Sequence, residues 1–100
     1  SSIINGETKL STPSVKLSTP KSKSIKVSWN KISGAKGYDV YRATSKKGTY
    51  SKRTTTSNLN YTNTGLTKGK TYYYKVRAYK IINNKKVYSS YSPIKSISSK

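Results

Sequence analysis

The sequence lacks the side chains on which catalysis and metal binding at neutral pH mainly depend. None of its 100 residues is histidine or cysteine, and only Glu7 and Asp39 are acidic. General acid–base and nucleophilic catalysis draw on histidine, paired carboxylates or activated cysteine. The two acids fall in a predicted tail and a predicted strand, so they are not expected to form a pair. We therefore expect no enzyme, no metal site, no cofactor and no disulfide framework. A serine or threonine activated by lysine stays open, but no local motif selects one.

Long hydrophobic runs are also missing. No apolar stretch reaches the roughly 18 residues that a membrane-spanning helix needs, and the first residues do not have the basic, apolar and small-residue order of a secretory signal. The sequence therefore predicts no membrane insertion and no export signal of its own, so that any export would depend on a longer parent chain.

Positive charge is what the sequence has in excess. Lysine and arginine number 21 against two acids, which gives a formal net charge of +19. Such a charge attracts anionic polymers through a long-range field that salt weakens. The basic residues recur every few positions instead of forming one block, which is typical of the solvated faces of alternating strands. Charge alone therefore predicts attraction without identifying an anion site.

The polar and apolar residues alternate with the period of β-strands after residue 13. Residues 1–12 are polar and aperiodic, so they are predicted to be a linker or tail. The following segments are rich in Val, Ile, Tyr and Thr and are separated by turn residues about every ten positions, which predicts an all-β sandwich or barrel. Strands are expected near residues 14–17, 25–30, 38–43, 49–55, 59–61, 72–79 and 87–97, with Pro93 interrupting the last.

The strand that follows Leu66 has the clearest alternation. Its apolar parity is predicted to face a core centred on Trp29, and its other parity is cationic and aromatic. The inward residues are Tyr72, Tyr74, Val76 and Ala78, and the outward residues are Tyr73, Lys75, Arg77 and Tyr79. In residues 38–43, Tyr38 and Val40 are predicted to point inward and Asp39 and Tyr41 outward.

The order of these parts resembles the fibronectin type III family. The resemblance is carried by Trp29, by the run Gly34-Ala35-Lys36-Gly37-Tyr38-Asp39-Val40-Tyr41-Arg42, and by Asn63-Thr64-Gly65-Leu66 with Tyr72 six residues later. It implies a seven-stranded antiparallel Greek-key β-sandwich, immunoglobulin-like, over residues 13–98. The chain is most similar to the Lys-, Tyr- and Ser-rich kind repeated in surface and secreted proteins of Gram-positive bacteria.

The resemblance also implies which residues are structural. Tyr72 would be the tyrosine corner, whose hydroxyl bonds to the backbone near the preceding turn. The structural set is Trp29, Tyr38, Val40, Leu66, Tyr72 and Val76. Lys68 stands where the family often has proline, and no Arg-Gly-Asp triplet occurs, so adhesion through that motif is not expected.

One surface is a candidate for ligand binding. In this family the third and sixth strands are neighbours, so Tyr41, Tyr73, Lys75, Arg77 and Tyr79 are expected to share one exposed face. Their rings could stack on sugars while the cations hold phosphate or carboxylate. The alternative is that the tyrosines only cover the sheet and pair across strands. Asp39 is expected to pair with Lys75 or Arg77 across the sheet.

Two functions follow from these observations. The first is a non-catalytic accessory or spacer module of a larger secreted or cell-wall-associated bacterial protein, presenting a neighbouring domain. The second is a binding module for an anionic cell-wall polymer or glycan through the cationic, tyrosine-bearing face. Partner binding by β-augmentation ranks last, because lysines and Pro93 lie on the predicted edges. No specific nucleic acid is expected, and the isolated domain should be a monomer.

Overall fold

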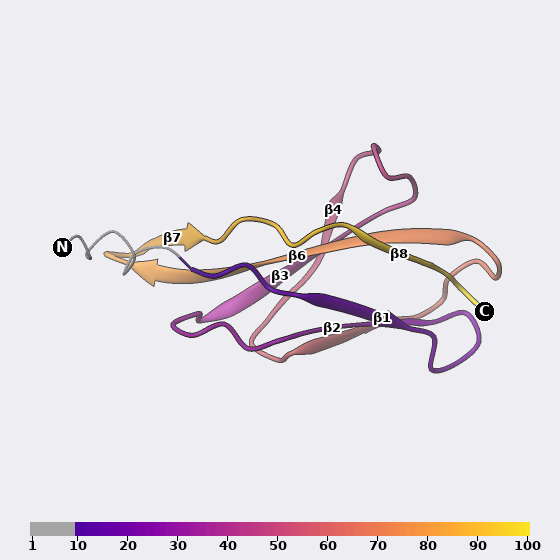
Figure 1. Cartoon of the computed structure of the whole chain (residues 1–100), viewed down its shortest axis with the longest axis horizontal. Coiled ribbons are helices and arrows are strands. Elements are labelled where there is room, and N and C mark those ends of the chain that lie inside the picture. Colours follow the sequence, from indigo (N-terminus) through magenta and orange to yellow (C-terminus); the bar gives the residue numbers. More distant parts are fainter. Residues whose placement is uncertain (1–9) are drawn as a thin grey trace.

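The computed structural model describes residues 10–100, which form two facing antiparallel β-sheets without any helix (Figure 1). The smaller sheet has the order β1-β2-β5, and the larger has β4-β3-β6-β7 with β8 also paired to β6. The strands are β1 (Val15–Ser18), β2 (Ile25–Trp29), β3 (Gly37–Ala43), β4 (Ser51–Thr56), β5 (Asn60–Asn63), β6 (Thr71–Ile82), β7 (Lys85–Tyr88) and β8 (Lys95–Ser98). The predicted all-β sandwich is confirmed.

The described residues contain eight strands instead of seven, because the last predicted strand is divided. Its two halves, β7 and β8, both pair with β6, at Tyr79↔Tyr88 and Tyr72↔Ile97. Residues 89–94 leave the regular ladder between them, and Pro93, which has no N–H to donate, lies in this interruption. β6 and β7 form a hairpin whose turn contains Asn83 and Asn84, with φ values of 52° and 66°, as a tight hairpin turn requires.

The inward parity of each strand forms one core between the sheets. Val27, Val40, Tyr74, Val76 and Ala78 are fully buried. The ring of Trp29 lies 5.6 Å from that of Tyr38, at an interplanar angle of 55°. These contacts join the two sheets, because Trp29 belongs to β2 and Tyr38 to β3.

The packed structure extends beyond residues 13–98 at both ends. Leu10, inside the predicted linker, is only 4% exposed and belongs to the core, whereas residues 1–9, with Glu7, lie outside the described residues. At the other end, Ser99 is buried and exchanges two backbone hydrogen bonds with the β5–β6 connection, to Gly69 at 2.8 Å and Lys70 at 3.0 Å.

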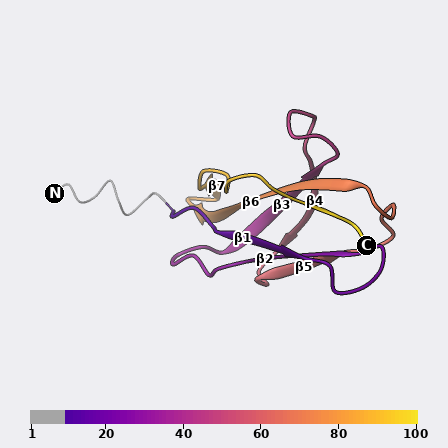
Figure 2. The same cartoon turned by 45° about the vertical axis from the view of Figure 1, so that its right-hand side comes forward.

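The molecule is elongated, with principal extents of 51 × 25 × 21 Å. The described chain begins toward one end of the long axis, near the β6–β7 hairpin, and finishes at the opposite end (Figures 1 and 2). The two ends of the described chain therefore lie at opposite ends, or poles, of the sandwich.

Candidate functional site

The larger sheet brings most of the predicted outward residues together. Tyr41 of β3 lies opposite Lys75 of β6, and Arg77 lies two pairs further along, opposite Asp39. Tyr79 is opposite Gly37 at one end of this ladder, and Tyr73 is opposite Ala43 at the other. These side chains do share one face, but Tyr41, Tyr73, Lys75, Arg77 and Tyr79 are half-buried, not exposed as expected.

Tyrosine rings from three other places cover the two cations at the centre of this face. Arg77 Cζ lies 3.6 Å from the ring centroid of Tyr88 and 4.8 Å from that of Tyr91. Lys75 Nζ lies 3.9 Å from the centroid of Tyr91 and 4.5 Å from that of Tyr50. Each contact is within the range of a cation–π interaction. Arg77 and Lys75 are therefore already engaged by residues of the same chain.

One of the covering rings also contacts Tyr41 of β3. Tyr91 meets Tyr41 edge to face, with centroids 5.3 Å apart, and Arg77 Nη2 donates a hydrogen bond to Tyr41 Oη at 3.0 Å. Burial raises the pKa of Tyr91 above its ordinary value, and it does the same for Tyr50. We call Tyr41, Tyr50, Tyr88 and Tyr91 with Lys75 and Arg77 the tyrosine–cation layer.

Asp39 lies beneath this layer. Its side chain points to the outer face, as predicted, yet the residue is completely buried. Its Oδ2 is 3.8 Å from Arg77 Nε, and its Oδ1 accepts a hydrogen bond from Thr55 Oγ1 at 2.7 Å. The expected pairing with Arg77 is confirmed. The carboxylate balances one charge of the layer and is not accessible to a ligand.

Tyr79 has a packing role at its end of the face. A Cβ atom added to Gly37 would lie 2.8 Å from Tyr79 Oη and 2.9 Å from two ring carbons. Only glycine leaves room for this ring. Lys86 Nζ lies 4.5 Å from the same ring's centroid, so Tyr79 is also occupied within the chain.

The predicted structural residues are all buried between the sheets: Trp29, Tyr38, Val40, Leu66, Tyr72 and Val76. The backbone N–H of Thr67 donates to Tyr72 Oη at 2.8 Å, which is the contact of a tyrosine corner. Burial raises the pKa of Tyr72, but the hydrogen bonds from Thr67 and the charges of Lys70 and Arg42 outweigh it and lower the pKa below its ordinary value.

A polar network closes the core beside Tyr72. Asn63 Oδ1 accepts hydrogen bonds from Arg42 Nη1 at 2.8 Å and from Tyr74 Oη at 2.9 Å. Arg42 follows the inward parity of β3, and its Cζ lies 5.3 Å from the centroid of the Tyr72 ring. Burial raises the pKa of Tyr74 to about 12, against the opposing charge of Arg42. The network is a structural cap and contains no free base.

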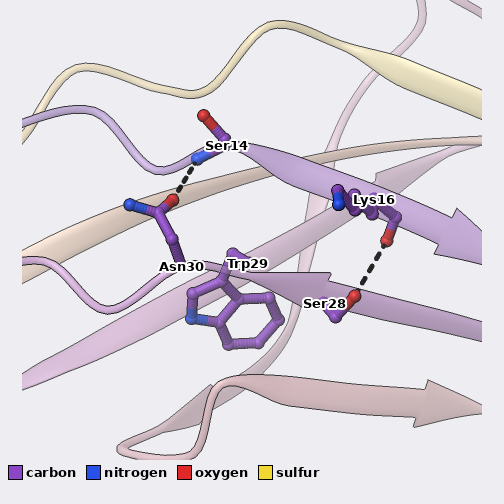
Figure 3. Close-up of a pocket in the computed structure, with 5 residues that line it drawn as sticks. All are labelled: Ser14, Lys16, Ser28, Trp29 and Asn30. Carbon is purple, nitrogen blue, oxygen red and sulfur yellow. Dashed lines mark hydrogen bonds between the residues drawn. The ribbon is translucent and has the colours of Figure 1, made fainter.

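A pocket of about 240 Å³ lies where β1 meets β2, beside Trp29 (Figure 3). Asn30 Oδ1 accepts a hydrogen bond from the Ser14 N–H at 2.7 Å. Ser28 Oγ donates to the carbonyl oxygen of Lys16 at 3.4 Å. A backbone carbonyl cannot act as the general base that a serine nucleophile needs. This arrangement therefore does not activate Ser28.

Metal-ligand clusters and membrane-spanning helices are both lacking in residues 10–100. This range holds no group of three or more His, Cys, Asp or Glu side chains that could bind a metal ion. It also holds no helix of the length and hydrophobicity needed to cross a membrane.

Comparison with solved structures decides the family. An Fn3-like protein from Clostridium thermocellum is 32% identical over 85% of this chain and 88% of its own, with a TM-score of 0.61. The chain belongs to the fibronectin type III family. No protein-family model matches the sequence, and no curated protein matches it; the subtype repeated in Gram-positive surface proteins remains a prediction.

Two other similar structures are longer chains that match this domain over only a part of their length. A β-1,2-glucanase from Parabacteroides distasonis matches 90% of this domain with a TM-score of 0.75 and 24% identity, although the match covers only 13% of the glucanase. The FN1–FN3 domains of chicken CNTN1 match 89% with a TM-score of 0.72 and 20% identity, over 30% of that chain. At these identities the likeness concerns the fold alone.

Proposed function

We propose that this fibronectin type III domain is a non-catalytic accessory module of a larger secreted or cell-wall-associated bacterial protein, in which it spaces and presents a neighbouring domain. The observation that carries the proposal is the position of the chain ends. The chain enters near one end of the 51 Å axis and leaves at the other (Figure 1), so domains fused to it would be held apart by its length.

The chemistry of the domain supports this role. The sequence has no histidine or cysteine, and Asp39 is buried against Arg77. The likeness to a small part of a bacterial glucanase supports a position beside a catalytic domain, and the likeness to a clostridial Fn3-like protein supports a bacterial source. An extracellular or cell-wall location agrees with a net charge of +19, which draws the module toward anionic wall polymers.

Energy transfer between two flanking fluorescent domains tests the spacer role. With residues 10–100 between donor and acceptor, we expect one transfer efficiency that is independent of salt. A Gly/Ser linker of the same length should give a broad distribution that changes with conditions. A Trp29→Ala variant, which loses the core contact with Tyr38, is the control for an unfolded spacer. Identical distributions for the domain and the Gly/Ser linker would overturn the proposal.

The second candidate, binding of an anionic cell-wall polymer or glycan through the outer face, remains a separate proposal. The rings of the tyrosine–cation layer already occupy Lys75 and Arg77, which weighs against it. It requires retention on purified cell wall at about physiological ionic strength to be lost in a Tyr73→Ala/Arg77→Ala variant that is still folded. Binding that fades smoothly with salt and ignores these substitutions would contradict it.

A further inference from the structure

A cationic groove lies at the pole of the sandwich where the chain finishes. It is formed by the β1–β2 connection, by Lys26 of β2 and by residues 62–65, at and just after the end of β5, and has a volume of about 520 Å³. Figures 1 and 2 show this connection at the same end as the C-terminus. The lining residues are Pro20, Lys21, Ser22, Lys23, Ser24, Lys26, Thr62, Thr64 and Gly65.

The ammonium groups of this groove differ from those of the tyrosine–cation layer in having no partner. Within residues 10–100, the side chains of Lys21, Lys23 and Lys26 make no hydrogen bond, ion pair or ring contact. The hydroxyls of Thr62 and Thr64 are likewise without an intramolecular partner in that range. Three cations and two hydroxyl groups thus line one cavity with their binding capacity unused.

The backbone holds one of these lysines in an unfavourable conformation. Lys23 has a φ of 59°, in the left-handed region where glycine or asparagine is preferred. Its N–H donates to the carbonyl oxygen of Lys100 at 2.5 Å, and its own carbonyl accepts from the Leu66 N–H at 3.0 Å. Both bonds are made by the main chain, so glycine would satisfy them with less strain. Lysine at this position adds an ammonium group to the groove at a cost in stability.

The residue types in the groove indicate the class of ligand. No arginine lines it, so the planar two-point recognition that suits carboxylates is not available. Lysine ammonium groups are point charges that suit tetrahedral oxyanions, and threonine hydroxyls can donate to the same oxygens or bond to sugar or polyol hydroxyls. No aromatic ring lines the groove, so it offers no platform for stacking a nucleic-acid base.

We propose that this groove binds the phosphate groups of a phosphodiester-linked polyol polymer, with Lys21, Lys23 and Lys26 neutralising successive phosphates. This proposal goes beyond the spacer role and does not depend on it, since binding can be measured on the domain alone. The polymer would then contact the end of the smaller sheet that lies near the C-terminus, and not the tyrosine–cation layer.

Two variants of equal net charge distinguish binding in the groove from attraction to the overall positive charge of the domain. Lys23→Gly/Lys26→Gln removes two groove cations, and Lys47→Gln/Lys52→Gln removes two exposed cations from β4 and the turn before it. The probe is fluorescently labelled poly(glycerol phosphate), titrated by anisotropy at about physiological salt. We expect the groove variant to lose about tenfold in affinity and the control variant to stay within about twofold. Equal losses in both variants would overturn the proposal, because they would assign binding to net charge.

Further measurements exclude misfolding and other polymers. Lys23→Gly alone should raise Tm by about 3 °C, because it relieves the left-handed strain, while it still weakens binding; a lowered Tm would contradict the strain argument. Addition of unlabelled poly(glycerol phosphate) should shift backbone amide resonances of residues 21–26 and 62–65, not those of residues 73–79. Affinity for single-stranded DNA or dextran sulfate equal to that for poly(glycerol phosphate) would overturn the assignment of the ligand.

Discussion

Tyrosine supplies nearly all the aromatic side chains of this domain, since ten tyrosines accompany one tryptophan and no phenylalanine. In the core this choice adds hydroxyl groups that need partners. Tyr38 Oη accepts from the Ile32 N–H at 2.9 Å, and Tyr72 Oη accepts from the Thr67 N–H at 2.8 Å. Each buried ring therefore fixes the backbone of an adjacent loop as well as filling the core.

Replacement of Tyr72 by phenylalanine tests this second role. The ring would still pack, but the Thr67 N–H would lose its acceptor, so we expect the free energy of unfolding to fall by about 1.5 kcal/mol in urea titrations. Tyr73→Phe is the matched control, because no hydrogen bond joins its hydroxyl to residues 10–100, and it should cost less than about 0.5 kcal/mol. A Tyr72→Phe variant as stable as the control would show that the hydrogen bond of the tyrosine corner does not stabilise the domain.

The buried Tyr74 makes stability depend on pH in the alkaline range. Its pKa is raised to about 12 in the folded domain, against about 10 in an unfolded chain. The folded state therefore retains a proton that the unfolded state loses. This contribution is complete below pH 10 and is lost as pH rises toward 12, by on the order of 2 kcal/mol. The difference in unfolding free energy between the native chain and Tyr74→Phe should shrink over this range; a constant difference would contradict the raised pKa.

Arg77 balances the one buried carboxylate of the described residues. Arg77→Met would leave Asp39 buried without its cation, so we expect a loss of about 3 kcal/mol. With Asn at position 39, the same Arg77 substitution should cost clearly less, giving a coupling energy of at least about 1 kcal/mol in a double-mutant cycle. Urea denaturation of the four proteins measures it. Strict additivity would show that Asp39 and Arg77 act independently.

At the scale of the elements, two serines keep β6 hydrogen-bonded where β7 and β8 are interrupted. The N–H of Val76 donates to Ser92 Oγ at 3.0 Å, and that of Ala78 donates to Ser89 Oγ at 2.9 Å. Each serine N–H in turn donates to the carbonyl oxygen of the same β6 residue, at 2.8 and 2.9 Å. The hydroxyl thus takes the place of a backbone carbonyl, and both serines are buried.

Replacement of both serines by alanine tests whether their hydroxyl groups serve as the hydrogen-bond acceptors of β6. Ser89→Ala/Ser92→Ala would leave two buried N–H groups on β6 without acceptors, at about 1–2 kcal/mol each. Hydrogen exchange of the Val76 and Ala78 amides should accelerate more than that of Tyr74. Ser90→Ala, at an exposed position in the same segment, is the control. Unchanged hydrogen-exchange rates of the Val76 and Ala78 amides would show that the serine hydroxyls do not protect this edge of β6.

Much of the architecture was predictable from strand parity, and the covering of the outer face was not. The alternation from Tyr72 to Tyr79 correctly assigns the core and outer faces of β6, because side chains alternate along any strand. It does not reveal that Tyr50, Tyr88 and Tyr91 fold over Lys75 and Arg77, since these rings come from other segments. The signal that the sequence does carry is Pro93, which indicates an interrupted edge strand because proline cannot donate to a ladder.

The groove is not predictable from the sequence for a related reason. Lys21, Lys23 and Lys26 lie within six residues, but Thr62 and Thr64 join them only through the pairing of β2 with β5. The sequence pattern predicts a linker at Leu10 because an isolated apolar residue among polar ones has no period, yet Leu10 is buried in the core. Sequence patterns within one segment cannot show contacts between distant segments.

At the scale of the whole molecule, the proposed spacer role requires a rigid sandwich whose chain ends lie at opposite poles. Because the native chain has no cysteine, spin labels can be attached only at chosen sites. Thr12→Cys and Ser98→Cys place labels on exposed residues near the two ends. Thr12 lies shortly before β1 and Ser98 is the last residue of β8, and both strands belong to the same sandwich, so the separation of the two labels should be fixed.

Pulsed electron–electron double resonance on this doubly labelled chain measures that separation directly. We expect one narrow distance distribution that is the same at low and high salt and the same when domains are fused to either end. Several distances, or a broad distribution that shifts with ionic strength, would show that the module does not hold its neighbours at a fixed spacing.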